Sequence, residues 1–300
     1  MNATAGDITV NLDGLWLLQA LLGVGRLAPE LRGRPYGQPR SMEWVMQHPG
    51  LGVLVDEGIC DEGAVVRPDI AARMRVLGTP DVEVVVLVAQ GPMSWSAPVA
   101  LDDPASWRSI PEGQLRIVLA RRDGRWASAV RAGSHVTIDD CAVVDPDWLS
   151  RLVCEALDSV HRAEPAAISA VNVPLDGICG AAAELAGAST AASRQAALRS
   201  VGLAGPALAQ MAQALEEPVA EAVLYGRAYI DATTAPGESV LDLRDTNAGR
   251  VALYRVNPPR GSQQQWMAAG PANAAQVRHG VVSALDSVPV KSWDTHERMG

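Results

Sequence analysis

The pattern of hydrophobic and polar positions along this chain changes period many times, and each change predicts a helix or a strand. Alternating apolar and polar positions predict strands, whereas apolar positions three or four residues apart predict helices. Capping residues and prolines such as Asp13, Ser41 and Pro68 mark the helix starts. In the first half the pattern predicts strands at 8–12, 82–88, 115–121, 125–130 and 136–144, and helices at 14–22, 41–48, 68–77 and 146–160.

Three segments of this half carry more specific signals. The run 82–88 is almost continuously β-branched, which predicts a strand buried on both faces. The dipeptide Asp123-Gly124 predicts a two-residue hairpin turn between its flanking strands. The segment 91–111 is long and rich in proline, serine and aspartate, so we expect a mobile loop instead of a core element.

The second half follows the same plan. The pattern predicts helices at 176–186, 191–200, 205–215 and 272–288, and strands at 219–232, 250–256 and 263–268. Each half therefore consists of helices, then about three antiparallel strands, then a closing helix. This order is typical of an α+β fold, here with mixed α/β character.

Short sequence matches link the two halves in the same order. Leu12-Asp13-Gly14 recurs as Leu175-Asp176-Gly177, residues 77–83 align without a gap with 215–221, Trp126 matches Trp266, and residues 156–160 recur letter for letter as 284–288. Their collinear order predicts an internal duplication with loop insertions. We therefore expect one domain made of two quasi-two-fold halves, 1–165 and 166–300, around a shared central surface.

Composition and charge narrow the class of protein. The chain has 300 residues, of which 48% are hydrophobic and 20% charged, as in ordinary globular proteins. Its net charge of −9 argues against binding to nucleic-acid phosphates or anionic membranes. The four cysteines are far apart, which favours reduced thiols. The apolar stretch 15–24 is short and follows acidic residues, so we expect no signal peptide, no membrane insertion and a soluble cytoplasmic protein.

The sequence motifs do not predict catalysis. Nucleotide-binding and serine-hydrolase motifs are absent from the sequence, and the five histidines lack metal-ligand spacing, so we expect no catalytic residue, metal or cofactor. The acidic pairs Asp139-Asp140 and Glu216-Glu217 are interpreted as solvated turns. The alternative is a carboxylate pair for glycoside hydrolysis, which requires a cleft.

Five arginines gather on the predicted hairpin around Trp126. They are Arg116, Arg121, Arg122, Arg125 and Arg131. Basic residues interleaved with a tryptophan could form a nucleic-acid-binding surface. The negative net charge of the chain favours another interpretation, in which the arginines keep an exposed sheet edge soluble. The nucleic-acid alternative stays open at this point.

The strand predicted at 219–232 has two different faces. At period two, one face carries Val223, Tyr225, Arg227, Tyr229 and Asp231, and the other carries Leu224, Gly226, Ala228 and Ile230. Two of the four tyrosines of the chain thus flank a guanidinium, which is typical of protein-binding surfaces. The alternative is a core-facing tyrosine pair whose hydroxyls have partners inside the protein.

Many short segments of the sequence resemble the EspG family, the cytosolic chaperones of mycobacterial type VII (ESX) secretion, and most closely the paralogue that serves the fifth ESX system. The resembling segments are 7–22, 28–32, 48–50, 71–74, 118–122, 129–131, 166–168, 170–174 and 250–254. The likeness extends from about residue 7 to residue 298 and rests on the number and order of these segments.

The resemblance implies quasi-two-fold halves with a central antiparallel sheet and flanking helical bundles. It also implies a function without catalysis: EspG proteins bind the hydrophobic tip of the PPE subunit in a PE–PPE heterodimer, keep the dimer soluble and deliver it for secretion. Their docking surface is the central sheet with the carboxy-terminal helices, which suggests a client surface here alongside the helix at 272–288.

Strand alternation, not a family motif, selects the individual partner-binding residues. The candidates are Tyr225, Arg227, Tyr229, Asp231 and Trp266. We expect Tyr229→Ala combined with Arg227→Ala to weaken client binding and to leave the fold intact. The alternatives are an adaptor for another helical client or, less favoured, for nucleic acid, and a weak homodimer stays open as a further assembly.

Overall fold

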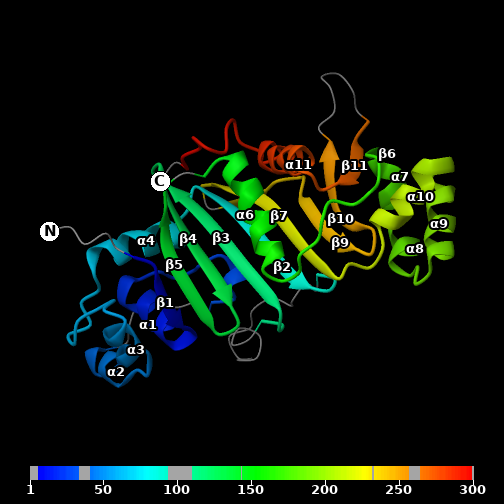
Figure 1. Ribbon diagram of the computed structural model, residues 1–300. Helices are drawn as coiled ribbons and strands as arrows, with labels where there is room; N and C mark the ends of the chain where they lie inside the picture. The colour runs from blue at the N-terminus through cyan, green and yellow to red at the C-terminus, as the bar shows by residue number, and fades with distance from the viewer. Residues whose placement is uncertain are drawn as a thin grey trace.

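The computed structural model describes residues 6–33, 41–93, 110–142, 144–231, 233–256 and 264–298. Across these ranges one antiparallel sheet of eleven strands runs through the molecule, with helices on both of its faces (Figure 1). The strand order is β1-β5-β4-β3-β2-β7-β9-β10-β11-β6, and β8 pairs with β7. The α+β class predicted from the sequence is confirmed.

Each half contributes strands, a group of helices and one closing helix. The first half contains β1 (Ile8–Asn11), α1 (Leu12–Leu22), η1 (Pro29–Leu31), α2 (Met42–Gln47), α3 (Gly50–Asp56), α4 (Pro68–Gly78), β2 (Val82–Gln90), β3 (Gln114–Arg122), β4 (Arg125–Ala132), β5 (His135–Cys141) and α6 (Pro146–Asp158). The second half contains β6 (Val171–Pro174), α7 (Leu175–Gly180), α8 (Ala182–Ala186), α9 (Ala191–Ser200), α10 (Gly205–Ala214), β7 (Ala220–Ile230), β8 (Thr233–Pro236), β9 (Leu241–Thr246), β10 (Gly249–Val256), β11 (Trp266–Pro271) and α11 (Ala274–Asp286).

Most helix-start signals are confirmed, and one is corrected. Ser41 caps α2 through its side chain, and Pro68 stands in the first turn of α4. Helix α1 is capped by Asn11 instead of Asp13, because the Asn11 side chain accepts a hydrogen bond from the amide of Gly14 at 2.8 Å.

The strand predictions succeed where the residues have a strong strand preference. The hairpin of β3 and β4 is confirmed, with positive φ angles of 49° at Asp123 and 74° at Gly124. Strands β6, β8 and β9 were not predicted, because they are short or carry residues such as Asp242 that occur rarely in strands. The loop expected at 91–111 lies mostly outside the described residues, as does the loop before β11.

The two halves share one topology. Outward from the centre, the first half places β2, β3, β4, β5 and β1, and the second places β7, β9, β10, β11 and β6. The matched segments 77–83 and 215–221 both join the last helix of a group to the central strand. Trp126 on β4 and Trp266 on β11 do not occupy equivalent strands, so that match is not part of the repeat. The shared topology agrees with a duplication, and the duplication itself stays a prediction.

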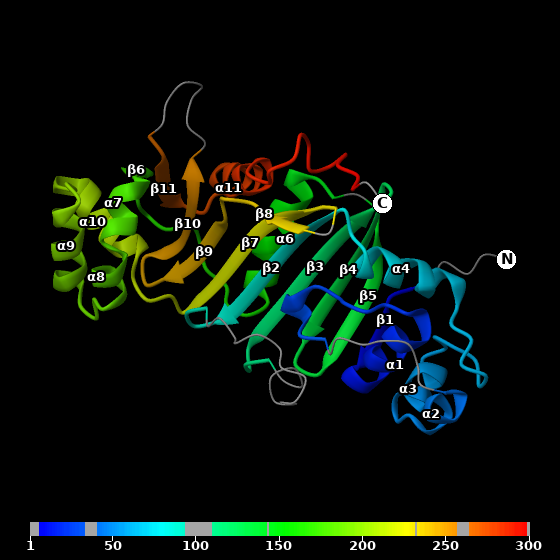
Figure 2. The same cartoon turned by 180° about the vertical axis from the view of Figure 1, so that it is seen from behind.

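Helices cover the two faces of the sheet differently (Figure 2). On one face α6 and α11 pack over a core cluster that includes Val84, Leu224 and Ala252. On the other face α1–α4 pack on the first half and α7–α10 on the second half, at opposite ends of the sheet. We call α1–α4 the first lobe, α7–α10 the second lobe, and their side of the sheet the lobe face.

Candidate protein-binding surface

Strand β7 carries Tyr225 and Tyr229, and its register with β2 determines which residues lie opposite its side chains. Tyr225 lies opposite Val85, and Arg227 lies opposite Glu83. Directly opposed residues of antiparallel strands point to the same face of a sheet. Because Val85 belongs to the apolar cluster of the first lobe, Tyr225 and Arg227 point to the lobe face.

Two carboxylates from different elements bind this row of side chains. Glu30, on η1, accepts hydrogen bonds from the hydroxyl of Tyr225 at 2.7 Å and from Nη1 and Nη2 of Arg227 at 2.7 and 2.8 Å. Glu83, on β2, accepts them from Nε of Arg227 at 2.6 Å and from the hydroxyl of Tyr229 at 2.7 Å. The resulting tyrosine network joins η1 in the first half to β7 in the second half.

The two carboxylates of the tyrosine network differ in their electrostatics. Glu83 is 1% exposed, and burial raises its pKa although Arg227 acts in the opposite direction. Burial also opposes ionisation of Glu30, but its contacts with Arg227 and Tyr225 outweigh burial and lower its pKa. Burial likewise opposes the charge of Arg227, yet Glu83 and Glu30 raise its pKa. The guanidinium therefore stays charged, with the Glu30 carboxylate as an ionised partner.

The hydroxyl and guanidinium groups of the tyrosine network have hydrogen-bond partners inside the protein. Arg227 is 7% exposed, and both tyrosines are half-buried. Burial, followed by the neighbouring carboxylate, raises the pKa of Tyr225 and of Tyr229, so both hydroxyls stay protonated and donate. The geometry is thus that of a tyrosine pair with internal partners. The accessible parts of the two rings remain for a protein partner, and that role stays a prediction.

Asp231 does not share the tyrosine face as the alternation predicted. Strand β7 ends at Ile230, and Asp231 is an exposed turn residue with a φ angle of 52°. A residue in the left-handed region leaves the strand geometry, so the period of two no longer applies to its side chain. Asp231 therefore lies in the turn between β7 and β8, beyond the tyrosine network.

Trp266 lies on the opposite face of the sheet from Tyr225. It pairs with Val256 at the start of β11, and alternation places it on the same face as Ala268, which belongs to the cluster under α6 and α11. Helix α11, the helix predicted at 272–288, also covers that face. The structure therefore groups Tyr225, Arg227 and Tyr229, and separates them from Trp266 and α11.

Glu30 and Glu83 were not among the site residues predicted from the sequence. One signal was available, because Glu83 interrupts the apolar run of a strand predicted to be buried on both faces. A buried carboxylate needs a cation or several hydrogen-bond donors. Arg227 is likewise the single charged residue between Glu221 and Asp231, and these two unusual charges pair directly across β2 and β7.

A second group of charges lies farther along the lobe face. Arg244 on β9 approaches Glu221 at 3.6 Å and Asp242 at 3.9 Å. Burial and the nearby Glu221 raise the pKa of Asp242. Arg244 thus lies within ion-pair distance of two carboxylates on this face.

The arginines of the β3–β4 hairpin are largely used inside the protein. Arg131 is fully buried and donates from Nη1 to the carbonyl oxygens of Leu31 and Arg32 at 2.6 and 3.0 Å. Burial, followed by neighbouring arginines, lowers its pKa to about 10. Arg121 donates to the carbonyl oxygen of His296 at 2.7 Å. These side chains hold chain segments to the sheet instead of forming one basic surface.

The second lobe keeps part of its apolar surface accessible. Neither α7 nor α8 contains a buried residue. Ile178, Leu185 and Leu203 pack against the small core cluster of this lobe and remain half-buried. Aliphatic side chains that are partly in water and lie close together are typical of interaction surfaces. The second lobe and the tyrosine network lie on the same face of the sheet.

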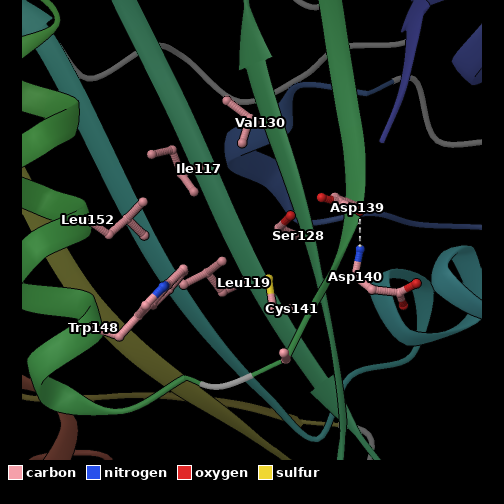
Figure 3. Close-up of a pocket in the computed structure, with 10 residues that line it drawn as sticks. Ile117, Leu119, Ser128, Val130, Asp139, Asp140, Cys141, Trp148 and Leu152 are labelled. Carbon is pink, nitrogen blue, oxygen red and sulfur yellow. Dashed lines mark hydrogen bonds between the residues drawn. The ribbon is translucent and has the colours of Figure 1, made fainter. Parts of the chain in front are cut away.

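A pocket of about 420 Å³ lies on the other face, between α6 and strands β3–β5 (Figure 3). Leu119 from the sheet and Trp148 and Leu152 from α6 line it, together with Cys141. Burial raises the pKa of the Cys141 thiol, although a hydrogen bond with Ser128 opposes this, so the thiol stays neutral. A neutral thiol is a weak nucleophile.

The acidic pair at the rim of this pocket lies at the end of a strand instead of in a turn, with side chains that are 47% and 48% exposed. Asp139 and Asp140 lie within β5 and form ion pairs at 3.9 and 2.9 Å with Arg73, whose side chain is fully buried. Their charges compensate a buried guanidinium, which a turn interpretation did not anticipate. Among the described ranges there is no cluster of three metal-ligating side chains and no helix long and apolar enough to cross a membrane.

Comparisons with known proteins agree with this architecture. The model of the EspG family matches residues 11–283. The ESX-5 secretion-associated proteins EspG5 of Mycobacterium marinum and Mycobacterium tuberculosis are 42% and 41% identical to this chain, in each case over 99% of both chains. The solved structure of M. tuberculosis EspG5 in complex with a PE25–PPE41 dimer superposes with a TM-score of 0.83 at 40% identity, over 97% of this chain and 100% of that one. The chain therefore belongs to the EspG family.

Proposed function

We propose that this chain is a cytosolic, non-catalytic chaperone for PE–PPE heterodimers of an ESX-5 type secretion system. The observation that carries the proposal is the full-length likeness to an EspG5 chaperone solved with its PE25–PPE41 client, at 40% identity and a TM-score of 0.83. Likeness over the whole chain supports a shared way of binding clients, because it includes both lobes and the sheet between them.

The client-binding surface proposed here is the lobe face between the tyrosine network and the second lobe. The half-buried aliphatic side chains of α7–α10 supply apolar area, and the rings of Tyr225 and Tyr229 supply rigid aromatic contacts. An apolar tip of a helical client aggregates when it is exposed to water. Covering such a tip takes about 800 Å² on each partner, which the sheet and one lobe together can offer.

Binding, not chemistry, is the function that this surface supports. Its ionisable side chains are paired with one another, as Arg227 is with Glu30 and Glu83. A chaperone must also release its client, which favours a few aromatic and aliphatic contacts over many buried ion pairs between the partners. Trp266 and Asp231, on other surfaces, are not part of the proposed contact.

Co-expression tests the proposal. The chain is produced together with PE–PPE pairs, one from each ESX class, and the soluble fraction is analysed by size exclusion with light scattering. We expect a soluble 1:1:1 complex with the ESX-5 pair. A folded chain that forms a complex with none of the pairs would reject the proposal, and light scattering of the chain alone shows whether it forms a homodimer.

Matched substitutions locate the surface in the same assay. Ile178→Ser with Leu185→Ser removes apolar area from the second lobe, and we expect the complex to be lost or weakened about tenfold or more. Val65→Ser is the control, because Val65 is 67% exposed and belongs to the first half. Equal complex formation by both variants would move the client surface away from the second lobe.

A further inference from the structure

Glu30 reaches the tyrosine network from a turn that is anchored independently of its carboxylate. Nη1 of Arg116 donates to the backbone oxygen of Glu30 at 2.9 Å, and Nη1 of Arg131 donates to the backbone oxygen of Leu31 at 2.6 Å. These contacts use the main chain of η1. The main chain of η1 is therefore held on the sheet by its own contacts, and the Glu30 carboxylate is left to bind Arg227 and the Tyr225 hydroxyl.

The Glu30 carboxylate fixes the outer end of Tyr225. The backbone of Tyr225 is held in β7 opposite Val85 of β2, its ring packs beside the core cluster of the first lobe, and its hydroxyl donates to Glu30. A tyrosine held at both ends presents one ring orientation. Such preorganisation lowers the entropy that is lost when a partner binds.

We propose that Glu30 is a positioning residue of the client-binding surface, which acts through the Tyr225 hydroxyl and sets the Tyr225 ring against an apolar client segment. This inference rests on the proposed function. The N–H groups of Arg227 already donate to Glu30 and Glu83 from Nε, Nη1 and Nη2. The network therefore presents tyrosine rings to the client instead of an unpaired charge, and it favours apolar side chains of the client over acidic ones.

A double-mutant cycle on client affinity tests this role. The probe is the purified PE–PPE dimer that forms a complex in co-expression, and its affinity is measured for the native chain, Glu30→Met, which has no acceptor for the Tyr225 hydroxyl, Tyr225→Phe, the double variant and Tyr225→Ala. We expect each of the first two changes to weaken binding roughly two- to tenfold, as the loss of one hydrogen bond does. The double variant should bind no more weakly than the weaker single variant, because both changes break the same contact. Tyr225→Ala should bind most weakly, because it also removes the ring.

Additive effects of the two single changes would overturn the inference, since Glu30 would then act independently of Tyr225. Glu238→Gln is the control, because Glu238 is 71% exposed in its ion pair with Arg255 at 2.8 Å, and we expect native affinity for it. Thermal midpoints of all variants identify any that fail to fold. If the native chain binds no PE–PPE dimer, the proposed function fails; if it binds and folded Glu30→Met binds equally, only this inference fails.

Discussion

The two lobes occupy equivalent places in the repeated topology but are packed differently. In the first lobe Leu15, Leu17 and Leu18 of α1 are at most 1% exposed, and Ile70 and Met74 of α4 are fully buried. In the second lobe α7 and α8 contain no buried residue, and its core cluster is small. The second lobe therefore has a smaller buried core than the first, although α2 of the first lobe also exposes Met42 and Met46 at 57% and 52%.

The difference has a physical consequence for function. A region with few buried apolar contacts opens locally at a low free-energy cost, and binding surfaces that adapt to a partner are drawn from such regions. A densely packed region resists rearrangement, because each lost contact leaves a cavity. We therefore interpret the first lobe as the support of the sheet and the second lobe as the part that meets the client.

The largest difference in the free energy of unfolding is expected between two arginine substitutions, one in the tyrosine network and one in the second lobe. Arg227→Met leaves the buried carboxylates Glu30 and Glu83 without their cation, and we expect a loss of about 3–5 kcal/mol in the free energy of unfolding. Arg194→Met in the second lobe removes a 3.9 Å contact with Glu216 and should cost about 1 kcal/mol. Urea unfolding followed by tryptophan fluorescence measures both.

This contrast changes one expectation drawn from the sequence. A variant with Arg227→Ala was expected to keep its fold intact, whereas the buried network makes a stability loss the first effect of that change. Client affinity of Arg227 variants therefore reports on folding as well as on contact. Equal destabilisation by Arg227→Met and Arg194→Met would contradict the interpretation of Arg227 as a buried structural cation.

Truncation of a leucine should also lower the free energy of unfolding more in the first lobe than in the second. Leu18 is fully buried in the first lobe, and Leu18→Ala should cost about 2–5 kcal/mol through lost burial and the cavity left behind. Leu185 in the second lobe is half-buried, and Leu185→Ala should cost less than about 1.5 kcal/mol. Thermal or urea unfolding of the two variants provides the comparison. A second lobe as sensitive as the first would mean that its packing is tighter than its exposure indicates.

Glycine substitutions probe how closely the helices approach one another. A Cβ at Gly50, the first residue of α3, would lie 2.4 Å from the carbonyl oxygen of Asp13, so Gly50→Ala should cost about 1–3 kcal/mol. A Cβ at Gly180, the last residue of α7, meets nothing within 4 Å, and Gly180→Ala should stabilise the chain by about 0.5–1 kcal/mol. Destabilisation by Gly180→Ala of the same size would show that the second lobe is equally crowded.

The smallest effect expected is the pH dependence that His48 in the first lobe contributes. His48 packs between the rings of Trp16 and Trp44 at 4.9 and 4.8 Å and accepts a hydrogen bond from the amide of Gly50. Burial lowers its pKa, although Asp13 acts in the opposite direction. The unfolded chain then binds a proton more readily, so this contribution to stability is complete above pH of about 6.5 and declines as the pH falls.

Unfolding midpoints measured between neutral pH and pH of about 5 test this expectation. His48→Gln should remove part of the decline seen for the native chain. The helices of the second lobe, residues 175–214, contain no histidine, so their local opening should not share this dependence. An identical pH profile for the native chain and His48→Gln would contradict the role of the buried imidazole.

The sequence predicted local features well and long-range partners poorly. Period-two alternation correctly placed Tyr225, Arg227 and Tyr229 on one face, because alternation depends only on neighbouring residues. The partner Glu30 is 195 residues from Tyr225, and only the folded chain brings them together. Trp266 was grouped with the tyrosines because alternation within one strand does not determine the faces of other strands.

The difference between the lobes could also be only partly predicted. The helices of both groups were expected from their apolar periodicity and caps, except that α3 was missed and α7 and α8 were expected as one helix. Periodicity does not report how deeply a side chain is buried. Packing depends on side-chain volume and on the approach of helices distant in sequence, as Gly50 and Asp13 illustrate. The resemblance to the EspG family predicted the class of partner, which strand and helix patterns do not encode.

Hydrogen exchange followed by mass spectrometry tests the central claim most directly, when the chain alone is compared with its complex with a PE–PPE dimer. We expect α7–α10 to exchange faster than α1–α4 in the free chain, because the second lobe has fewer buried contacts. In the complex, α7–α10 and β7 should gain protection while α1–α4 remain unchanged. Protection gained in α1–α4 without any change in α7–α10 would contradict the assignment of the client surface to the second lobe.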